Sequence, residues 1–209
     1  MRVSKKYEFV FVSTPKACTH TIYKILKDHF YEGLLEIAFH DNKISRVYKK
    51  FFRWTIVRDP FSRVISLWWS GCRLAHLDQY NFRKRSGGQY DFTKFVVWLA
   101  DNKENKHNIL MMNQSEWLAP TEPIHIIHLE KLKQELEQLP FWKEGIEIPQ
   151  LNTTTEKIQT QSRDEGKDIA RPPFHILYKN SEAVEAVIKW AEPDFDRFGY
   201  EKEIKWLKK

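Results

Sequence analysis

Several features are scarce or absent in this chain of 209 residues, and each absence excludes a class of protein. Only two cysteines are present, Cys18 and Cys72. Two cysteines exclude a disulfide-rich scaffold, and without a Cys-x-x-Cys pair there is no Cys-based structural zinc site. The sequence therefore predicts reduced, cytoplasmic surroundings and no metal.

Long apolar runs and flexible linkers are absent as well. No uncharged stretch reaches the roughly 18 residues of a membrane span, and the opening MRVSKKYEFVFV lacks the small-residue cleavage site of a signal peptide. We therefore expect a soluble chain with no membrane span. Only seven glycines occur, and no repeat or Gly/Ser/Pro-rich tract divides the sequence, which predicts a single domain over 1–209.

Aromatic and basic residues are plentiful. Aromatic residues make up 14% and hydrophobic residues 42% of the chain, enough to fill a sizeable core and to exclude intrinsic disorder. Lysine and arginine number 34 against 28 acidic residues, a net charge of +6. This surplus favours an anionic partner, which could be a nucleotide, an acidic glycan or a nucleic acid.

Two strand–loop–helix units stand out near the N-terminus. A nearly uncharged strand over Tyr7–Ser13 is followed by a loop and by a helix that Thr19 can cap, with apolar residues at helical spacing. A second strand over Phe51–Val57 has Arg58 at its carboxyl end, with Asp59 as N-cap and Pro60 as the first helical residue. This second helix buries its apolar stripe, and its polar face carries Ser62, Arg63 and Ser66.

Further elements alternate in the same way. Strands are predicted over Leu34–Phe39 and Pro123–Leu129; helices are predicted over 41–50, Asp91–Leu99, 129–139 and from a Ser181 cap to Pro193. This alternation predicts an α/β fold with a mainly parallel central sheet flanked by helices. Ligands of such folds bind outside the carboxyl ends of the strands.

The first loop, STPKACTHT, has the composition of an anion site. A helix N-terminus attracts anions, Lys16 adds a positive charge, and Thr14, Thr19 and Thr21 carry hydroxyl donors. Taken alone, Lys16 could also be a solvated residue in an ordinary turn. The loop lacks the glycines and the Gly-Lys-Ser/Thr ending of a P-loop ATPase.

The second loop, TIVRDPFSRVIS, offers a guanidinium at Arg58 and a hydroxyl at Ser66, eight residues later. Arginine suits phosphate because its planar group can donate two parallel hydrogen bonds. Arg58 and Asp59 could instead form a structural ion pair. Two anion sites on neighbouring strand ends nevertheless favour a ligand with phosphates at both ends of a nucleoside.

Together, FVSTPKACT and RWTIVRDPFSRVIS resemble the paired signature of sulfotransferases that use 3′-phosphoadenosine 5′-phosphosulfate (PAPS), particularly the carbohydrate sulfotransferase branch. Weaker similarity continues in NQSEWL, IHIIHLEKLKQEL, LNTTTE and DFDRFGYE. The resemblance implies a sulfotransferase fold with a P-loop-like nucleotide-binding core. It also implies transfer of a sulfonate from PAPS to a hydroxyl acceptor, here a carbohydrate, with 3′-phosphoadenosine 5′-phosphate (PAP) as the second product.

The same resemblance assigns roles to residues. In the family, the first loop binds the 5′-phosphosulfate, which here implies Pro15, Lys16, Ala17, Cys18, Thr19, His20 and Thr21. The second loop binds the 3′-phosphate, which implies Arg58 and Ser66. The family loop often has one residue more between Pro-Lys and Cys-Thr, and a Ser, Thr or Asn in place of His20.

Sulfonate transfer also needs a base for the acceptor proton and positive charge near the leaving oxygen. Lys16 can supply the charge. Histidine is the usual base at neutral pH, and His40 matches a His-containing stretch of the family. His20, Asp41 and Glu36 are alternatives.

Two rival functions remain open at this point. A nucleotide-dependent phosphotransferase shares the strand–loop–helix arrangement, but the missing GxxxxGK[ST] motif counts against it. A basic nucleic-acid-binding module would need clustered basic residues, whereas here they are scattered among acidic segments. We therefore expect the partners to be PAPS or PAP and a hydroxyl-bearing glycan, with no nucleic acid.

Overall fold

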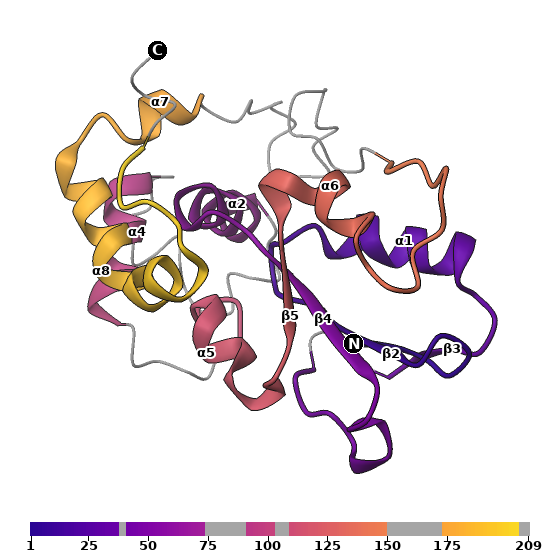
Figure 1. The fold of residues 1–209 in the computed structure, drawn as a ribbon. Coiled ribbons are helices and arrows are strands. Elements are labelled where there is room, and N and C mark those ends of the chain that lie inside the picture. Colours follow the sequence, from indigo (N-terminus) through magenta and orange to yellow (C-terminus); the bar gives the residue numbers. More distant parts are fainter. Residues whose placement is uncertain (38–40, 74–90, 103–108, 150–172, 205–209) are drawn as a thin grey trace. The chain divides into compact units, whose positions relative to one another are not determined.

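The computed structural model describes residues 1–37, 41–73, 91–102, 109–149 and 173–204, with only the backbone for 70–73 (Figure 1). The chain divides into two compact units. The first, which we call the sheet unit, comprises 1–59 and 112–151; the second, the helical unit, comprises 60–111 and 152–209. The single domain over 1–209 stays a prediction, and each unit is described by itself.

The sheet unit is built on five strands in the order β3-β1-β2-β4-β5. Their bounds are β1 Arg2–Ser4, β2 Phe9–Val12, β3 Leu34–Glu36, β4 Phe52–Val57 and β5 His125–His128. Strands β2, β4 and β5 pair in parallel, and only β1 runs antiparallel to its two neighbours. The α/β fold with a mainly parallel sheet is thereby confirmed.

Strand β1 was not anticipated from the sequence. It pairs with β2 from Arg2↔Phe11 to Ser4↔Phe9, so the basic opening of the chain forms the first arm of a hairpin. A strand of three residues is too short to show an alternating pattern, and its Arg and Ser are both buried. Burial of these polar residues comes from tertiary pairing that composition does not reveal.

Helices α1 (Thr19–His29) and α6 (Leu132–Leu136) pack against one face of this sheet. Ile22 and Leu26 of α1 and Leu136 of α6 are fully buried in one cluster with Trp54 of β4. Phe9 and Phe11 place their rings against Trp54 at centroid distances of 6.1 and 4.5 Å. The sheet unit also contains α5 (Gln114–Leu118) and the short 3-10 helices Arg46–Tyr48, Ala119–Thr121 and Leu129–Lys131.

The helical unit consists of α2 (Pro60–Arg73), α4 (Phe92–Asp101), α7 (Phe174–Leu177) and α8 (Ser181–Phe198). Its core is aromatic: the Phe61 ring meets Tyr178 and Phe195 at 5.4 and 5.3 Å. Tyr178 donates its hydroxyl proton to the Phe61 carbonyl (2.7 Å). Trp68 and Trp69 are buried in this core, as expected for core residues rather than for adenine platforms.

Several local expectations were wrong in detail. Cys18, not Thr19, is the N-cap of α1, and Asn180, not Ser181, caps α8 by accepting from the Glu182 amide (2.9 Å). The expected helix over 41–50 is reduced to the 3-10 turn at Arg46–Tyr48, and the one over 129–139 to a 3-10 turn and α6.

Pro193 does not stop the last helix. The chain passes through Pro193 to Phe198 because Ala191, two residues earlier, adopts non-helical angles (φ −103°, ψ 17°). A kink at that point spares the helix the clash that a proline otherwise causes. Arg63, expected on a polar face, is instead fully buried with its guanidinium over the Trp190 ring at 5.3 Å.

None of the helices in the described part of the chain is long and apolar enough to cross a membrane.

Candidate functional site

The two predicted anion loops lie at the same edge of the sheet. Strands β2 and β4 are parallel neighbours, paired up to Val12↔Thr55, so the segments that leave their carboxyl ends are adjacent. A direct hydrogen bond joins them: Arg58 Nη1 donates to the Lys16 carbonyl at 3.4 Å. The structure therefore brings together Lys16 and Arg58, which the sequence placed 42 residues apart.

The backbone of the first loop has an unusual conformation. Lys16 (φ 68°) and Cys18 (φ 46°) both adopt left-handed angles, although neither is a glycine. Left-handed residues in a short loop are one component of a nest, a concavity of successive backbone N–H groups that binds anions. Left-handed backbone costs roughly 1–2 kcal/mol per non-glycine residue, so other contacts must hold the loop in place.

Thr14 provides the first of these contacts. Its carbonyl oxygen accepts hydrogen bonds from the Ala17 amide (3.3 Å) and from the Thr19 hydroxyl (3.2 Å). The Thr19 hydroxyl, predicted as a donor to the ligand, thus donates to the loop itself. Thr14, Thr19 and Thr21 are all buried.

Thr55 of β4 provides the second contact, and sequence reasoning missed it. Its hydroxyl donates to the Val12 carbonyl at 2.7 Å and lies 2.9 Å from the Thr14 hydroxyl. Because a threonine has one hydroxyl proton, Thr14 must be the donor in the second bond. The sequence feature that could have pointed to this contact is a threonine among the mostly apolar residues of β4, FRWTIV. Thr55 is fully buried in the structure.

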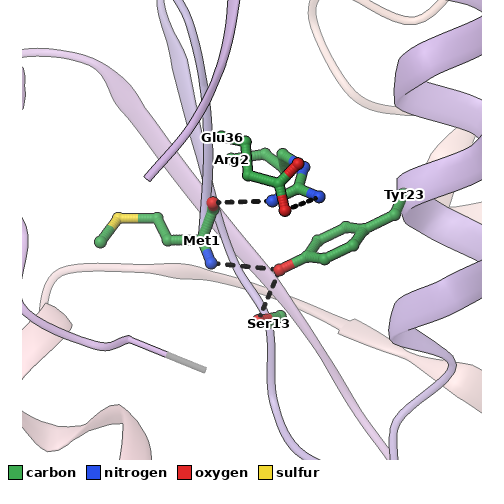
Figure 2. A network of polar contacts seen from close by, with 5 residues as sticks. All are labelled: Met1, Arg2, Ser13, Tyr23 and Glu36. Atoms are coloured by element: carbon green, nitrogen blue, oxygen red, sulfur yellow. Dashed lines mark hydrogen bonds and ion pairs between the residues drawn. The ribbon is translucent and has the colours of Figure 1, made fainter. Parts of the chain in front are cut away.

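Ser13, just before the loop, belongs to a polar network that Figure 2 shows. Tyr23 of α1 donates to the Ser13 hydroxyl (3.0 Å) and accepts from the Met1 amino group (3.1 Å). Burial and the neighbouring Arg2 charge lower the pKa of that amino group to about 6. Arg2 stacks 3.7 Å from the Tyr23 ring and pairs with Glu36 at 2.7 Å.

The other predicted residues of the first loop differ in exposure. Pro15 and Ala17 are buried, Lys16 and Cys18 are half-buried, and His20 is exposed in the first turn of α1. Burial raises the pKa of the Cys18 thiol to about 12, although the Arg58 guanidinium acts in the opposite direction. The Cys18 thiol is therefore neutral at physiological pH.

The second loop is held by side chains from later in the chain. Gln114 accepts from the Arg58 amide through Oε1 and donates to the Arg58 carbonyl through Nε2, both at 2.9 Å. Glu130 accepts from the amide of Asp59 at 2.9 Å. Gln114 lies in NQSEWL, one of the weakly family-like segments, but nothing in that segment revealed its partner.

The remaining predicted residues belong to other segments of the chain. Ser66 lies on α2, half-buried, in the helical unit. Of the base candidates, His40 lies outside the described residues. Glu36 is engaged with Arg2, and Asp41 accepts from the Lys43 amide at 2.9 Å, a local turn contact. Within the described part of the chain, no three His, Cys, Asp or Glu residues cluster as metal ligands would.

Comparison with known proteins identifies the class. The sheet unit has an α/β fold, and its two candidate loops follow the carboxyl ends of adjacent parallel strands, where ligands of such folds bind. The model of the sulfotransferase family matches residues 1–201, so the chain belongs to the sulfotransferase family. It is therefore a transferase by family. No curated protein and no solved structure matches this chain.

Proposed function

We propose that this protein transfers a sulfonate group from PAPS to a hydroxyl of a carbohydrate acceptor. The observation that carries the proposal is the contact between Arg58 and the Lys16 carbonyl, because it joins two cationic loops at one sheet edge. PAPS has anionic groups at both the 5′ and the 3′ position. A pair of adjacent cationic loops suits such a ligand better than a site with one loop would.

The donor set of the first loop fits the 5′-phosphosulfate. The left-handed angles of Lys16 and Cys18 suit a nest of backbone N–H groups, and α1, with 11 residues, contributes the positive end of its dipole. Residues from Pro15 to Thr21 would hold this end of the nucleotide. Arg58 and Ser66 would hold the 3′-phosphate, with Ser66 contributed by the helix that follows Arg58.

In the transfer step, the acceptor hydroxyl oxygen forms a bond to sulfur while the bond from sulfur to the 5′-phosphate oxygen breaks. Lys16 stabilises the negative charge that develops on that departing oxygen. His40 accepts the proton that the hydroxyl loses, and PAP leaves with the electron pair of the broken bond. Sulfated acceptor, PAP and a protonated imidazole are the products of the step.

A thermal-shift experiment with four ligands tests the nucleotide assignment. PAP should stabilise the protein more than adenosine 5′-phosphate, because only PAP carries the 3′-phosphate that Arg58 binds. A ligand at about 100 times its dissociation constant adds roughly 2.7 kcal/mol to the free energy of unfolding. Equal shifts with both nucleotides would contradict the role of Arg58, and a larger shift with ATP or with a single-stranded oligonucleotide would favour one of the rival functions.

The assignment of the base has its own test. Replacing His40 with Ala should lower sulfonate transfer by about 10²–10⁴-fold and leave the affinity for PAP unchanged. The wild-type rate should rise with pH through a limb near the histidine reference pKa of about 6.5, since only neutral imidazole accepts a proton. If the His20→Ala variant is inactive and His40→Ala is active, the base lies in the first loop instead.

A further inference from the structure

Arg58 stands where the sheet ends. The last paired residues of β4 and β5 are Val57 and His128, so Arg58 is the first residue of the chain beyond that ladder. Neither β2 nor β5 pairs with Arg58, so neither strand fixes the direction of the backbone there. The direction matters because it sets where the Arg58 side chain points.

Gln114 takes the place of a strand partner at this residue. Its carboxamide bonds both the N–H and the carbonyl of Arg58, each at 2.9 Å, as a residue on an adjacent strand would. The Gln114 side chain is fully buried, which makes these bonds costly to lose. Neither bond involves the guanidinium, whose Nη1 donates to the Lys16 carbonyl.

The element that carries Gln114 is itself anchored. Asn113 caps α5 by accepting from the Glu116 amide (2.8 Å), and the Trp117 carbonyl accepts from the Asn42 side chain (2.8 Å). Glu130 fixes the next amide after Arg58, that of Asp59, at 2.9 Å. Two successive amides after β4, those of Arg58 and Asp59, are thus each held by a side chain from later in the chain.

We infer that Gln114 is a positioning residue, which orients Arg58 for recognition of the 3′-phosphate and so sets the preference for PAP over adenosine 5′-phosphate. The inference rests on the proposed function. Gln114 itself does not touch the nucleotide in this account. A preorganised guanidinium binds phosphate more tightly because less conformational freedom is lost on binding.

The test measures the dissociation constants of PAP and adenosine 5′-phosphate by calorimetry. Gln114→Met keeps the length of the side chain but removes both bonds to Arg58. The affinity for PAP should fall about tenfold or more, equivalent to about 1.4 kcal/mol, while the affinity for adenosine 5′-phosphate stays within about twofold. The KM for PAPS should rise with little change in kcat.

A matched control and a double variant separate positioning from general damage. Thr121→Val removes one buried hydrogen bond, to the Leu118 carbonyl (2.7 Å), close to α5 but away from Arg58, and should leave the preference for PAP intact. Arg58→Ala should abolish the preference. Adding Gln114→Met to Arg58→Ala should cause no further loss of affinity for PAP, because Gln114 acts on PAP only by orienting the Arg58 side chain.

The outcomes distinguish this inference from the proposed function. If wild-type protein shows no preference for PAP, the proposed role of Arg58 fails. Suppose that Arg58→Ala loses the preference for PAP. The positioning role is then overturned if a folded Gln114→Met variant keeps that preference, or if its affinities for PAP and adenosine 5′-phosphate fall by the same factor. Gln114→Asn, too short to reach both Arg58 atoms, serves as the second variant, and failure of both variants to fold would also overturn the inference.

Discussion

The loop from Ser13 to Cys18 is held by residues close to it in the sheet, whereas the turn at Arg58 and Asp59 is held by side chains that come 56 and 71 residues later. The first loop relies on Thr14 and on the neighbouring strand β4. Its shape follows from left-handed residues and from a hydroxyl chain. The second owes its shape to Gln114 and Glu130. Apart from the bond from Arg58 to the Lys16 carbonyl, the contacts described for the two loops are separate, so we expect substitutions to perturb mainly one loop at a time.

The largest expected effect comes from the first loop. Lys16→Ala removes the charge that we propose lies beside the departing oxygen, and it should lower kcat by about 10²–10³-fold at saturating PAPS. Arg58→Ala, in the second loop, should instead raise the KM for PAPS and weaken PAP binding. Steady-state kinetics with both variants checks the contrast, and near-normal kcat in Lys16→Ala would make the first loop a binding feature only.

A smaller effect is expected from the hydroxyl chain under the first loop. Thr55→Val keeps the shape of the side chain but leaves the Val12 carbonyl and the Thr14 hydroxyl without this partner. The free energy of unfolding should drop by about 1–3 kcal/mol, measured by urea denaturation. Thr55→Ser retains the hydroxyl and should restore most of the loss. A loss in Thr55→Ser with little loss in Thr55→Val would point to packing of the methyl group instead, because only the serine variant lacks that methyl.

The smallest effect tests the left-handed backbone at Cys18. Alanine there still bears the steric cost of φ 46°, whereas glycine does not. Cys18→Gly should therefore be more stable than Cys18→Ala by about 1 kcal/mol.

The exposed position Lys24, in the middle of α1, serves as the control for this pair. There the order should reverse, with Lys24→Ala more stable than Lys24→Gly by about 1 kcal/mol, because the backbone is helical. Thermal unfolding of all four variants gives the comparison. The same order at both positions would mean that the left-handed angle at Cys18 carries no strain.

Local patterns predicted the parts of the fold that local forces determine. Strands β2, β4 and β5 and helices α1, α2, α4 and α8 lie where apolar periodicity placed them, within a few residues at their ends. The parts that were missed depend on distant contacts. Strand β1 exists because it fits between β2 and β3, and α8 continues through Pro193 because Ala191 bends the backbone.

The same division holds in the candidate site. Residue types made Lys16 and Arg58 candidates, and parallel pairing of their strands brings the two loops together as expected. The left-handed angles could not be foreseen, because the usual signal for them is glycine and this loop has none. The bonds from Gln114 to Arg58 join residues whose local sequences contain no sign of each other.

The long-range support of Arg58 has a consequence for the order of folding during synthesis. Every contact described here for the first loop, apart from the one with Arg58, joins residues no later than Thr55. Those contacts can form as soon as β4 leaves the ribosome. The bonds of Arg58 and Asp59 can form only after Gln114 and Glu130 have been synthesised. Closing such long intervening segments also carries an entropic cost. A nascent chain of about 100 residues would thus already contain the partners described here for the first loop but not Gln114 and Glu130, which hold the second.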